Sequence, residues 1–527
     1  MLAFNWRRPG MARLILNTAV AFLICIFMLY CGPDSATAQE PLKKSPGASE
    51  LDEILERFDD QPSKGQENKE LDNVLEGFQD EIEAQKEVNE LDNIMRGFKE
   101  DKTAAEELTK KDKEKKPPFW DLSGSVSLGA SFNFAHDAPK HGETDYRGLS
   151  RLRPELQLDL DLVLSKNWKA LISGRAFYDL AYMINGRDEY TDEVLDEYEK
   201  EAEFGEVYLQ GSLLANLDLK VGRQIVVWGK SDNIRVVDVL NPLDRRELGL
   251  VDIEDLRLPV TMTKLDYYFG KWNLSGVAVH EIRFNKEPAF GSDFYPIDFP
   301  PPHEEEPCEG FEHTEFGLAL KGIFSGWGIS FFGAHFFDDQ PHLEVVGPAS
   351  PAEPPRLKRV HSRLTMLGVA ANLAKGNWLF KTEAAYFDGL EFFNVPEKTK
   401  SRFDLLFGVE YSGFTDTTIT LEMVNRHLFN FDPRMENDPD RAEEDDFQSV
   451  FRFTRDFRNE TIELTILASI LGLTAENGAF ERVSLQYDLT DDWSITGGVV
   501  LYQSGDNPMF SDIGNNDRLF FEIKYSF

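Results

Sequence analysis

The chain has 527 residues, with 93 acidic and 56 basic side chains and a formal net charge of −37 at pH 7. Such an acidic protein is a poor candidate for binding nucleic acid, whose phosphates repel it. The length exceeds a typical globular domain but suits one large barrel, and three cysteines are too few for a disulfide framework.

The N-terminus has the pattern of a secretory signal peptide. Three arginines precede an apolar run at residues 14–30, and Ala36-Thr37-Ala38 offers the small residues of a cleavage site. A retained membrane anchor is the alternative, but no second apolar run of spanning length follows. We therefore predict a signal peptide at residues 1–38, which leaves Cys308 as the one cysteine of the mature protein.

Residues 39–118 form an acidic segment in which a 20-residue unit occurs three times. Each unit has apolar residues at i, i+3, i+4 and i+7, the pattern of a short amphipathic helix. Helices this short are marginal in water and need a partner surface. We interpret the segment as an acidic, mostly disordered tether, with docking of the three helices to a periplasmic or inner-membrane exporter component as the alternative. The apolar stripes begin and end at Leu51 and Phe58, Leu71 and Phe78, and Leu91 and Phe98.

From Trp120 onward the hydrophobic pattern has period two, as in β-strands. In residues 151–164 apolar and charged side chains alternate, so one face suits lipid and the other is charged. A soluble sheet can show the same alternation, so this strand alone does not decide. The charged side chains of this face and the next strand are Arg151, Arg153, Glu155, Asp159, Asp161 and Arg175.

Eight short turns alternate with longer loops, which is the asymmetry of outer-membrane barrels. With both ends of the barrel in the periplasm, eight turns predict an all-β, antiparallel transmembrane barrel of about 18 strands over residues 119–527, with 16 as the alternative. The turns are expected at Lys166-Asn167, Ala215-Asn216, Gly270-Lys271, Ser325-Gly326, Gly376-Asn377, Gly413-Phe414, residues 456–459 and Asp491-Asp492.

Aromatic residues support the same topology. Indole rings prefer the membrane–water interface, so tryptophans that directly follow turns predict a periplasmic aromatic girdle. They are Trp168, Trp272, Trp327, Trp378 and Trp493. The last strand alternates up to Tyr525 and Phe527, and this ending resembles the C-terminal signal that the barrel-assembly machinery recognises. The expected location is the bacterial outer membrane, with lipid as the barrel's surroundings and residues 39–118 in the periplasm.

Patterns of catalytic sites are absent from the sequence, so a non-enzymatic protein without cofactor or metal is expected. Gly229-Lys230-Ser231 lacks the glycine that a phosphate-binding loop needs at position 224, where Gln224 stands. Acidic clusters at residues 304–306 and 436–446 raise the alternative of calcium binding, but their ligand spacing is not ordered. Solvated loops are the prediction there.

One long loop, from Trp228 to Pro259, is more apolar than the others. Apolar loop segments favour burial, so we predict that it folds inward and constricts the lumen, whereas packing on the outer rim is the alternative. Its residues expected at the constriction are Arg235, Asn241, Pro242, Arg245 and Arg246. The charged inner face would set selectivity, as charged rings do in pores, or would brace the wall as a salt-bridged ladder.

The segment Val221-Gly222-Arg223-Gln224, followed by Trp228-Gly229 and Asn241-Pro242, resembles an uncharacterised family of large outer-membrane barrels. Its members often accompany RND-type (MMPL-like) exporters and LolB-like proteins, which implies traffic of lipid or hydrophobic compounds. The motif residues are Gly222, Arg223, Gln224 and Trp228. Arg223 breaks the alternation of its strand, which predicts a bulge or an interface position there.

The resulting functional hypothesis is a barrel that carries or gates a substrate across the outer membrane together with a periplasmic partner. The first alternative is a passive general porin. A structural or adhesive barrel is the second, and an outer-membrane enzyme using paired lumen carboxylates is the third.

Overall fold

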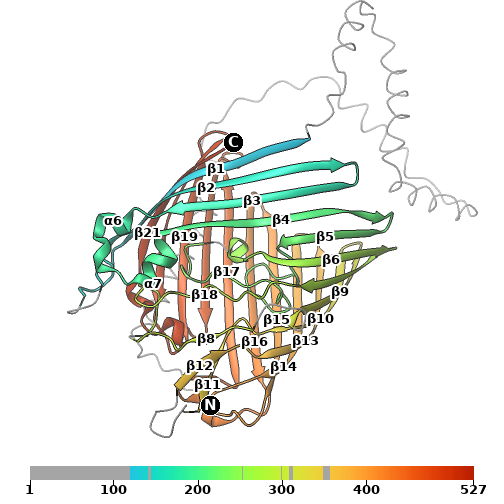
Figure 1. The fold of residues 1–527 in the computed structure, drawn as a ribbon. Coiled ribbons are helices and arrows are strands. Elements are labelled where there is room, and N and C mark those ends of the chain that lie inside the picture. The colour runs from blue at the N-terminus through green and yellow to red at the C-terminus, as the bar shows by residue number, and fades with distance from the viewer. Residues whose placement is uncertain (1–118, 140–143, 252, 298, 308–312, 348–355) are drawn as a thin grey trace, which may run out of the picture. The chain divides into compact units, whose positions relative to one another are not determined.

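The structure is a computed structural model that describes residues 119–527 except 140–143, 252, 298, 308–312 and 348–355. The expected signal peptide and the three-copy segment, with its six docking residues from Leu51 to Phe98, lie outside the described residues. The described chain forms an antiparallel β-barrel (Figure 1), which confirms the predicted fold class.

Eighteen strands form the barrel sheet. Each pairs with the next along the chain, and β1 also pairs with β21, which closes the barrel. The strands are β1 (Trp120–Asn133), β2 (Gly148–Ser165), β3 (Trp168–Tyr178), β4 (Lys200–Leu214), β5 (Leu217–Gln224), β6 (Val260–Phe269), β7 (Trp272–Val279), β9 (Glu315–Phe324), β10 (Trp327–Phe337), β13 (Arg363–Lys375), β14 (Trp378–Leu390), β15 (Lys400–Phe414), β16 (Thr417–Leu428), β17 (Asp445–Phe457), β18 (Ile462–Leu471), β19 (Gly478–Asp488), β20 (Trp493–Gln503) and β21 (Arg518–Ser526).

The remaining elements are short and lie in the long loops. A small sheet combines β8 (Glu304–Glu305), β11 (His342–Val346) and β12 (Arg356–Val360). Among the described residues, no helix is long and apolar enough to cross a membrane. The helical turns are α6 (Ala181–Asn185), η4 (Arg187–Glu189), α7 (Asp192–Val194), η5 (Leu195–Glu199), η6 (Ile253–Leu256), η8 (Pro433–Glu436), η9 (Pro508–Phe510) and η10 (Ile513–Asn515).

The eight turn regions predicted from the sequence all connect neighbouring strands, so the count of 18 strands is confirmed and the alternative of 16 is wrong. Two turns lie two residues later than expected, at residues 415–416 and 458–461, and the last turn, residues 489–492, contains the predicted Asp491-Asp492. Gly413 and Phe414 still belong to β15, because a register shift between Tyr411 and Phe414 extends that strand. The turn follows at Asp416, whose φ of 50° is left-handed.

The wall has an apolar outside and a more polar inside, as the period-two pattern requires. On β2, outward Leu156 and Leu158 are 39% and 37% exposed, whereas inward Arg153 is 6% exposed. The five predicted girdle tryptophans are each the first residue of a strand that leaves a short turn. At the C-terminal residue, Phe527 N donates a hydrogen bond to Gly124 O of β1 at 2.9 Å, and Gly124 N donates to Phe527 O at 3.0 Å.

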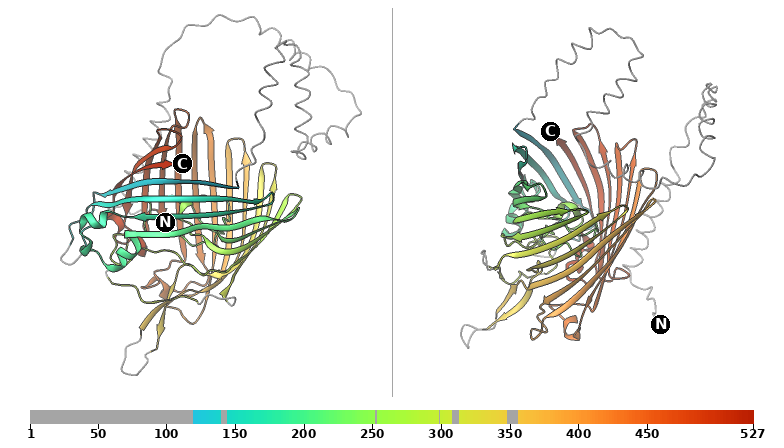
Figure 2. Two further views of the ribbon diagram at one scale, coloured as in Figure 1. Left: turned by 45° about the horizontal axis from the view of Figure 1, so that its top comes forward. Right: turned by 90° about the vertical axis from the view of Figure 1, so that its right-hand side faces the viewer.

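The barrel is strongly twisted. Figure 2 shows the blue and green strands of the first part of the barrel crossing the upright orange strands of the opposite wall. Sheet twist produces such crossing when a wide sheet closes on itself. The lumen between these two walls contains the candidate functional site.

Candidate functional site

The segment between β5 and β6, residues 225–259, lies inside the barrel; we call it the inner loop. Trp228 and Val237 are 2% and 0% exposed and join the main apolar cluster with inward side chains of β6, β7, β9, β10 and β13–β20. The Trp228 ring lies 5.1 Å from that of Phe332 on β10. Apolar packing therefore fills the part of the lumen that these strands enclose.

The base of the inner loop is held by Asn241, which is fully buried. Its Oδ1 accepts a hydrogen bond from Val226 N at 2.8 Å, and its Nδ2 donates to Gln224 O at 3.2 Å and Leu258 O at 2.9 Å. One side chain therefore joins the two ends of the loop. Asp238 adds a second link, because it accepts from Trp228 N at 3.1 Å and from Arg257 Nε at 2.9 Å.

Two buried carboxylates attach the loop to β14 and β16. Glu383 on β14 accepts from the backbone N–H groups of Lys230 and Ser231, the latter at 2.8 Å. Glu422 on β16 accepts from Ser231 Oγ at 2.7 Å and from Asn233 N at 2.9 Å. Both glutamates are at most 2% exposed, so these hydrogen bonds are shielded from water.

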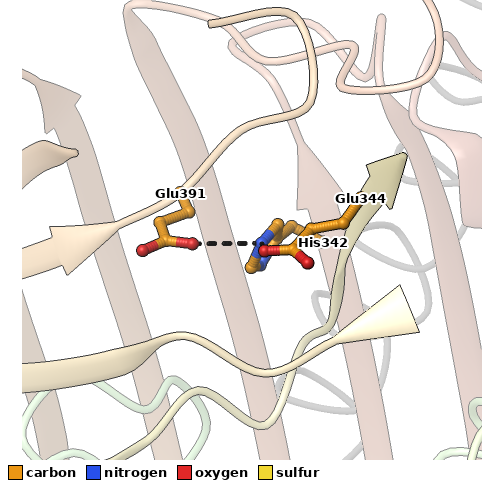
Figure 3. Close-up of side chains that lie close together, drawn as sticks. All are labelled: His342, Glu344 and Glu391. Carbon is orange, nitrogen blue, oxygen red and sulfur yellow. Dashed lines mark ion pairs between the residues drawn. The ribbon is translucent and has the colours of Figure 1, made fainter. Parts of the chain in front are cut away.

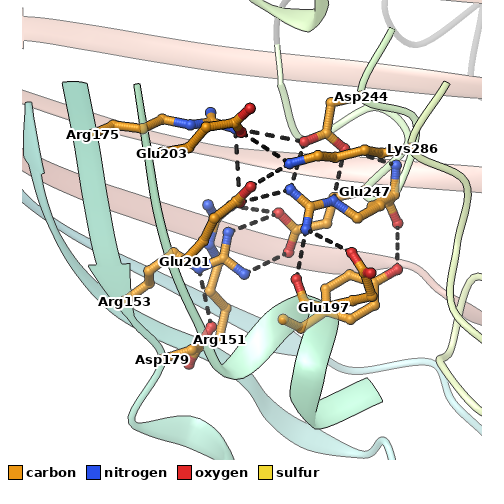
Figure 4. Close-up of polar contacts among 12 residues, drawn as sticks. Arg151, Arg153, Arg175, Asp179, Glu197, Glu201, Glu203, Asp244, Glu247 and Lys286 are labelled. Atoms are coloured by element: carbon orange, nitrogen blue, oxygen red, sulfur yellow. Dashed lines mark hydrogen bonds and ion pairs between the residues drawn. The ribbon is translucent and has the colours of Figure 1, made fainter. Parts of the chain in front are cut away.

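The opposite wall holds the loop through an ion-pair network (Figure 4). Glu247 of the inner loop lies 3.1 Å from Arg153 and 3.5 Å from Arg151, both on β2. Burial opposes ionisation of Glu247, but the neighbouring guanidinium groups of Arg151, Arg153 and Arg246 outweigh it and lower its pKa to about 2. Glu247 is therefore a carboxylate at neutral pH, and the inner loop spans the lumen between two charged attachments.

Between the loop and β1–β4 lies a cavity of about 1260 Å³. Its lining is mostly polar and includes backbone and side chains of β19–β21 and their turns. Of the six predicted lumen charges, five line it: Arg151, Arg153, Glu155, Asp159 and Arg175. Asp161 is exposed on the same strand but is not part of this lining.

The predicted loop residues have different environments. Arg235 donates to Asp238 O and Asn241 O within the loop, at 2.8 and 2.7 Å. Arg246 pairs with Glu201 of β4 at 2.9 Å, and Arg245 pairs with Glu287 at 3.2 Å. Pro242 O accepts from Leu258 N at 2.8 Å. These residues thus brace the loop and tie it to its surroundings.

The motif residues surround the base of the inner loop. Gln224 is buried and donates to Met262 O at 3.0 Å. The bulge expected at Arg223 is absent, because the pairing of β5 with both neighbouring strands continues through this residue. The backbone irregularity lies one residue earlier, at Gly222, whose φ is 129°. Arg223 then reaches Glu203 at 2.6 Å and Glu281 at 3.3 Å.

Sequence reasoning did not single out Glu247, Glu383 or Lys381. Lys381 on β14 pairs with Asp232 of the inner loop. A signal for two of them was present: Lys381 and Glu383 are charged residues in a strand whose other side chains are largely apolar or small. Glu247 carries no such signal, because its partners are distant in sequence.

Residues of both acidic loop clusters have partners in the structure. Glu304 pairs with Arg359 at 2.6 Å and with His361 at 2.8 Å, and Glu305 pairs with Lys358 at 2.9 Å. In the second cluster, Asp440 accepts from Phe393 N at 2.9 Å, among other internal contacts. These contacts favour loop structure over calcium binding at both places.

A further group of three ligand-type side chains, His342, Glu344 and Glu391, lies in the long loops (Figure 3). His342 Nε2 lies 3.2 Å from Glu391 and 3.6 Å from Glu344. Lys358 also pairs with Glu344 at 3.2 Å, so a cation is already present beside this carboxylate. Contacts within and between these loops, among them the Lys358–Glu344 ion pair, explain the arrangement.

A closed antiparallel barrel with an apolar outside and a charged, partly filled lumen has the architecture of transmembrane β-barrels. The chain belongs to the family described as "Protein of unknown function (DUF1302)", whose model matches residues 102–527. The expected membership in an uncharacterised family of outer-membrane barrels is thereby confirmed. The match begins after the third copy of the N-terminal repeat.

Several solved structures are similar to the chain. A BenF-like porin from Pseudomonas fluorescens Pf-5 has a TM-score of 0.47 and 11% identity, covering 78% of this chain and 98% of the porin. Pseudomonas aeruginosa OccK2 (OpdF), crystallised with glucuronate, has a TM-score of 0.44 and 11% identity, covering 77% and 97%. OmpTdeltaL8, a loop deletion mutant of a Vibrio cholerae outer-membrane protein, has a TM-score of 0.35 and 8% identity, covering 77% and 99%. The search of curated proteins found no significant match.

Proposed function

We propose that this protein is a gated channel of the outer membrane, in which the inner loop controls passage through the lumen. The observation that carries this proposal is the double attachment of the loop, to Glu383 and Glu422 on one wall and to Arg151 and Arg153 on the other. The loop is not part of the strand ladder that closes the barrel, so it can move without breaking the barrel wall. Passage would follow the polar cavity beside β1–β4.

The charged cavity bears on the substrate class. Family resemblance implies lipid or hydrophobic compounds, yet Arg175, Glu155 and Asp159 face the route. Charged walls suit a polar solute or the polar headgroup of a lipid, because an apolar chain gains nothing by displacing water from them. The substrate should therefore have a polar portion that fits the cavity.

Single-channel conductance in planar bilayers tests the gate. The intact protein should conduct poorly, and deletion of residues 229–256 should raise the conductance strongly. The double variant E383Q/E422Q should open more often than the wild type, because neutral amides hold the loop N–H groups less well. A matched control is D192N/E193Q, which removes two exposed charges from α7.

Large, steady conductance in the intact protein would contradict the gate and favour a passive porin. The size of the polar cavity is the observation that supports that rival. Silence in all variants, with the barrel folded, would contradict a channel and favour a structural or adhesive role. Folding is checked by heat-modifiable migration on gels.

A further inference from the structure

One strand of the barrel wall is much longer than the neighbour that follows it. The register of β4 with β3 continues up to Lys200, opposite Tyr178. Its register with β5 stops at Val207, because β5 ends at Gln224 and the chain turns into the lumen. The described chain places no strand against the β5-facing edge of residues 200–206.

A comparable overhang on β2 is covered by hydrogen bonds. β2 extends past the end of its register with β3 at Glu155. There Leu152 N donates to Asp179 Oδ1 at 2.9 Å, Leu152 O accepts from Leu180 N at 2.8 Å, and Leu149 O accepts from Asn185 Nδ2 at 2.8 Å. The edge of β4, by contrast, is covered by ion pairs between side chains.

Ion pairs bridge the edge of β4. Glu203 lies 2.6 Å from Arg283 and 3.1 Å from Lys286, and Lys286 also pairs with Glu201. The backbone of Lys286 bonds instead to the inner loop, at Leu243 O and Arg245 N, with N–O distances of 2.9 and 2.8 Å. Side chains therefore close this part of the wall, and we call these four charged residues the latch.

The polar cavity reaches the same edge. Its lining includes Glu203, Phe204, Gly205 and Glu206. Phe204 faces out of the wall and is 65% exposed, so the cavity and the outside are separated here by one strand edge. Outward apolar side chains of β4 extend from Leu214 to Phe204, about the length that a tilted strand needs to cross hydrocarbon.

A free strand edge is costly in lipid and is tolerated where it lines a water-filled space. We propose that the wall has a side opening between residues 200–206 and residues 281–286, which the latch closes. Through it the apolar chain of a single-chain amphiphile passes into the bilayer while the polar head stays in the charged cavity. This inference rests on the proposed channel function and names its substrate class.

Fluorescence quenching in proteoliposomes tests the opening. The full chain carries Cys308→Ser and a bimane label on Ser127→Cys, a residue that lines the cavity from β1. The probe is a lysophosphatidylcholine with a nitroxide on its headgroup. The variant E201Q/E203Q should increase quenching several-fold at equal probe content, and R283Q/K286Q should do the same from the other side of the latch.

D192N/E193Q is the matched control and should behave as the wild type. Equal quenching in the control and both latch variants would overturn the side opening. If quenching rises in the latch variants but deletion of residues 229–256 leaves the conductance unchanged, the side opening is supported and the loop gate is contradicted. If the deletion raises the conductance but quenching stays at the wild-type level, only the loop gate is supported. A benzophenone amino acid at Phe204 should crosslink to lipid, and crosslinking to a second copy of the chain would mean that the edge pairs with protein instead.

Discussion

Asn241 is the residue on which the conformation of the inner loop most depends, because its side chain makes three hydrogen bonds to the two ends of the loop. Asn241→Ala leaves buried backbone groups without partners, and each such group costs about 1–3 kcal/mol. We expect the free energy of unfolding to fall by about 3 kcal/mol in urea titrations, together with more frequent channel opening. The control D192N/E193Q, which changes two exposed side chains of α7, should change conductance little. An unchanged unfolding midpoint for Asn241→Ala would show that the loop is held elsewhere.

Glu247 predicts how acid affects the loop. Its pKa is lowered from the usual 4.5 to about 2, so it stabilises the folded state above pH 4.5 and loses this contribution as the pH falls toward 2. The shift corresponds to on the order of 3 kcal/mol. Unfolding should therefore cost less free energy in Glu247→Gln than in the wild type at pH 7, and the difference should shrink at pH 3. A difference that stays constant from pH 7 to pH 2 would contradict the ion-pair account.

At the scale of elements, β9 packs closely against the inner loop because Gly317 of β9 has no side chain. A Cβ on Gly317 would lie 2.7 Å from Trp228 Cη2 and 3.3 Å from Leu240 Cδ1. Gly317→Ala should therefore destabilise the protein by about 1–3 kcal/mol, the usual cost of overpacking. Gly276 on neighbouring β7 has no atom within 4 Å of such a Cβ, so Gly276→Ala is the matched control and should be nearly neutral. Equal unfolding midpoints for the two variants would mean that Trp228 moves freely.

The strands could be predicted from the sequence because their pattern is local. Alternation in residues 151–164 and tryptophans after turns define β2, β3 and the short-turn rim without any tertiary information. The turn at Asp416 was placed two residues early, since a register shift cannot be read from alternation.

The candidate site was harder to predict because its contacts join distant parts of the chain. An apolar composition indicated that the inner loop should be buried, but Ser231 meets Glu422 across 191 positions of sequence. The free edge of β4 was equally hidden, because it arises from the difference in length between β4 and β5. Pairings of this kind are set by the closed barrel as a whole.

For the whole molecule, the barrel should be independent of the acidic N-terminal segment. The wall begins at β1, and it is closed by the β1–β21 pairing from Ser125–Ser526 to Asn133–Arg518, which the Gly124–Phe527 hydrogen bonds extend. The family model starts at residue 102, after the three repeats. Deletion of residues 39–118 behind the signal peptide should therefore leave heat-modifiable folding and conductance unchanged.

The same deletion should abolish contact with a periplasmic partner, since the predicted apolar stripes lie in this segment. In-cell crosslinking to a candidate exporter component measures this contact. Leu51, Leu71 and Leu91 changed together to Ser keep the length and charge of the segment while removing one apolar anchor from each stripe. If this triple variant loses the crosslink as the deletion does, the stripes carry the docking. If only the deletion loses it, the segment acts as an acidic tether, and if neither does, the docking hypothesis is wrong.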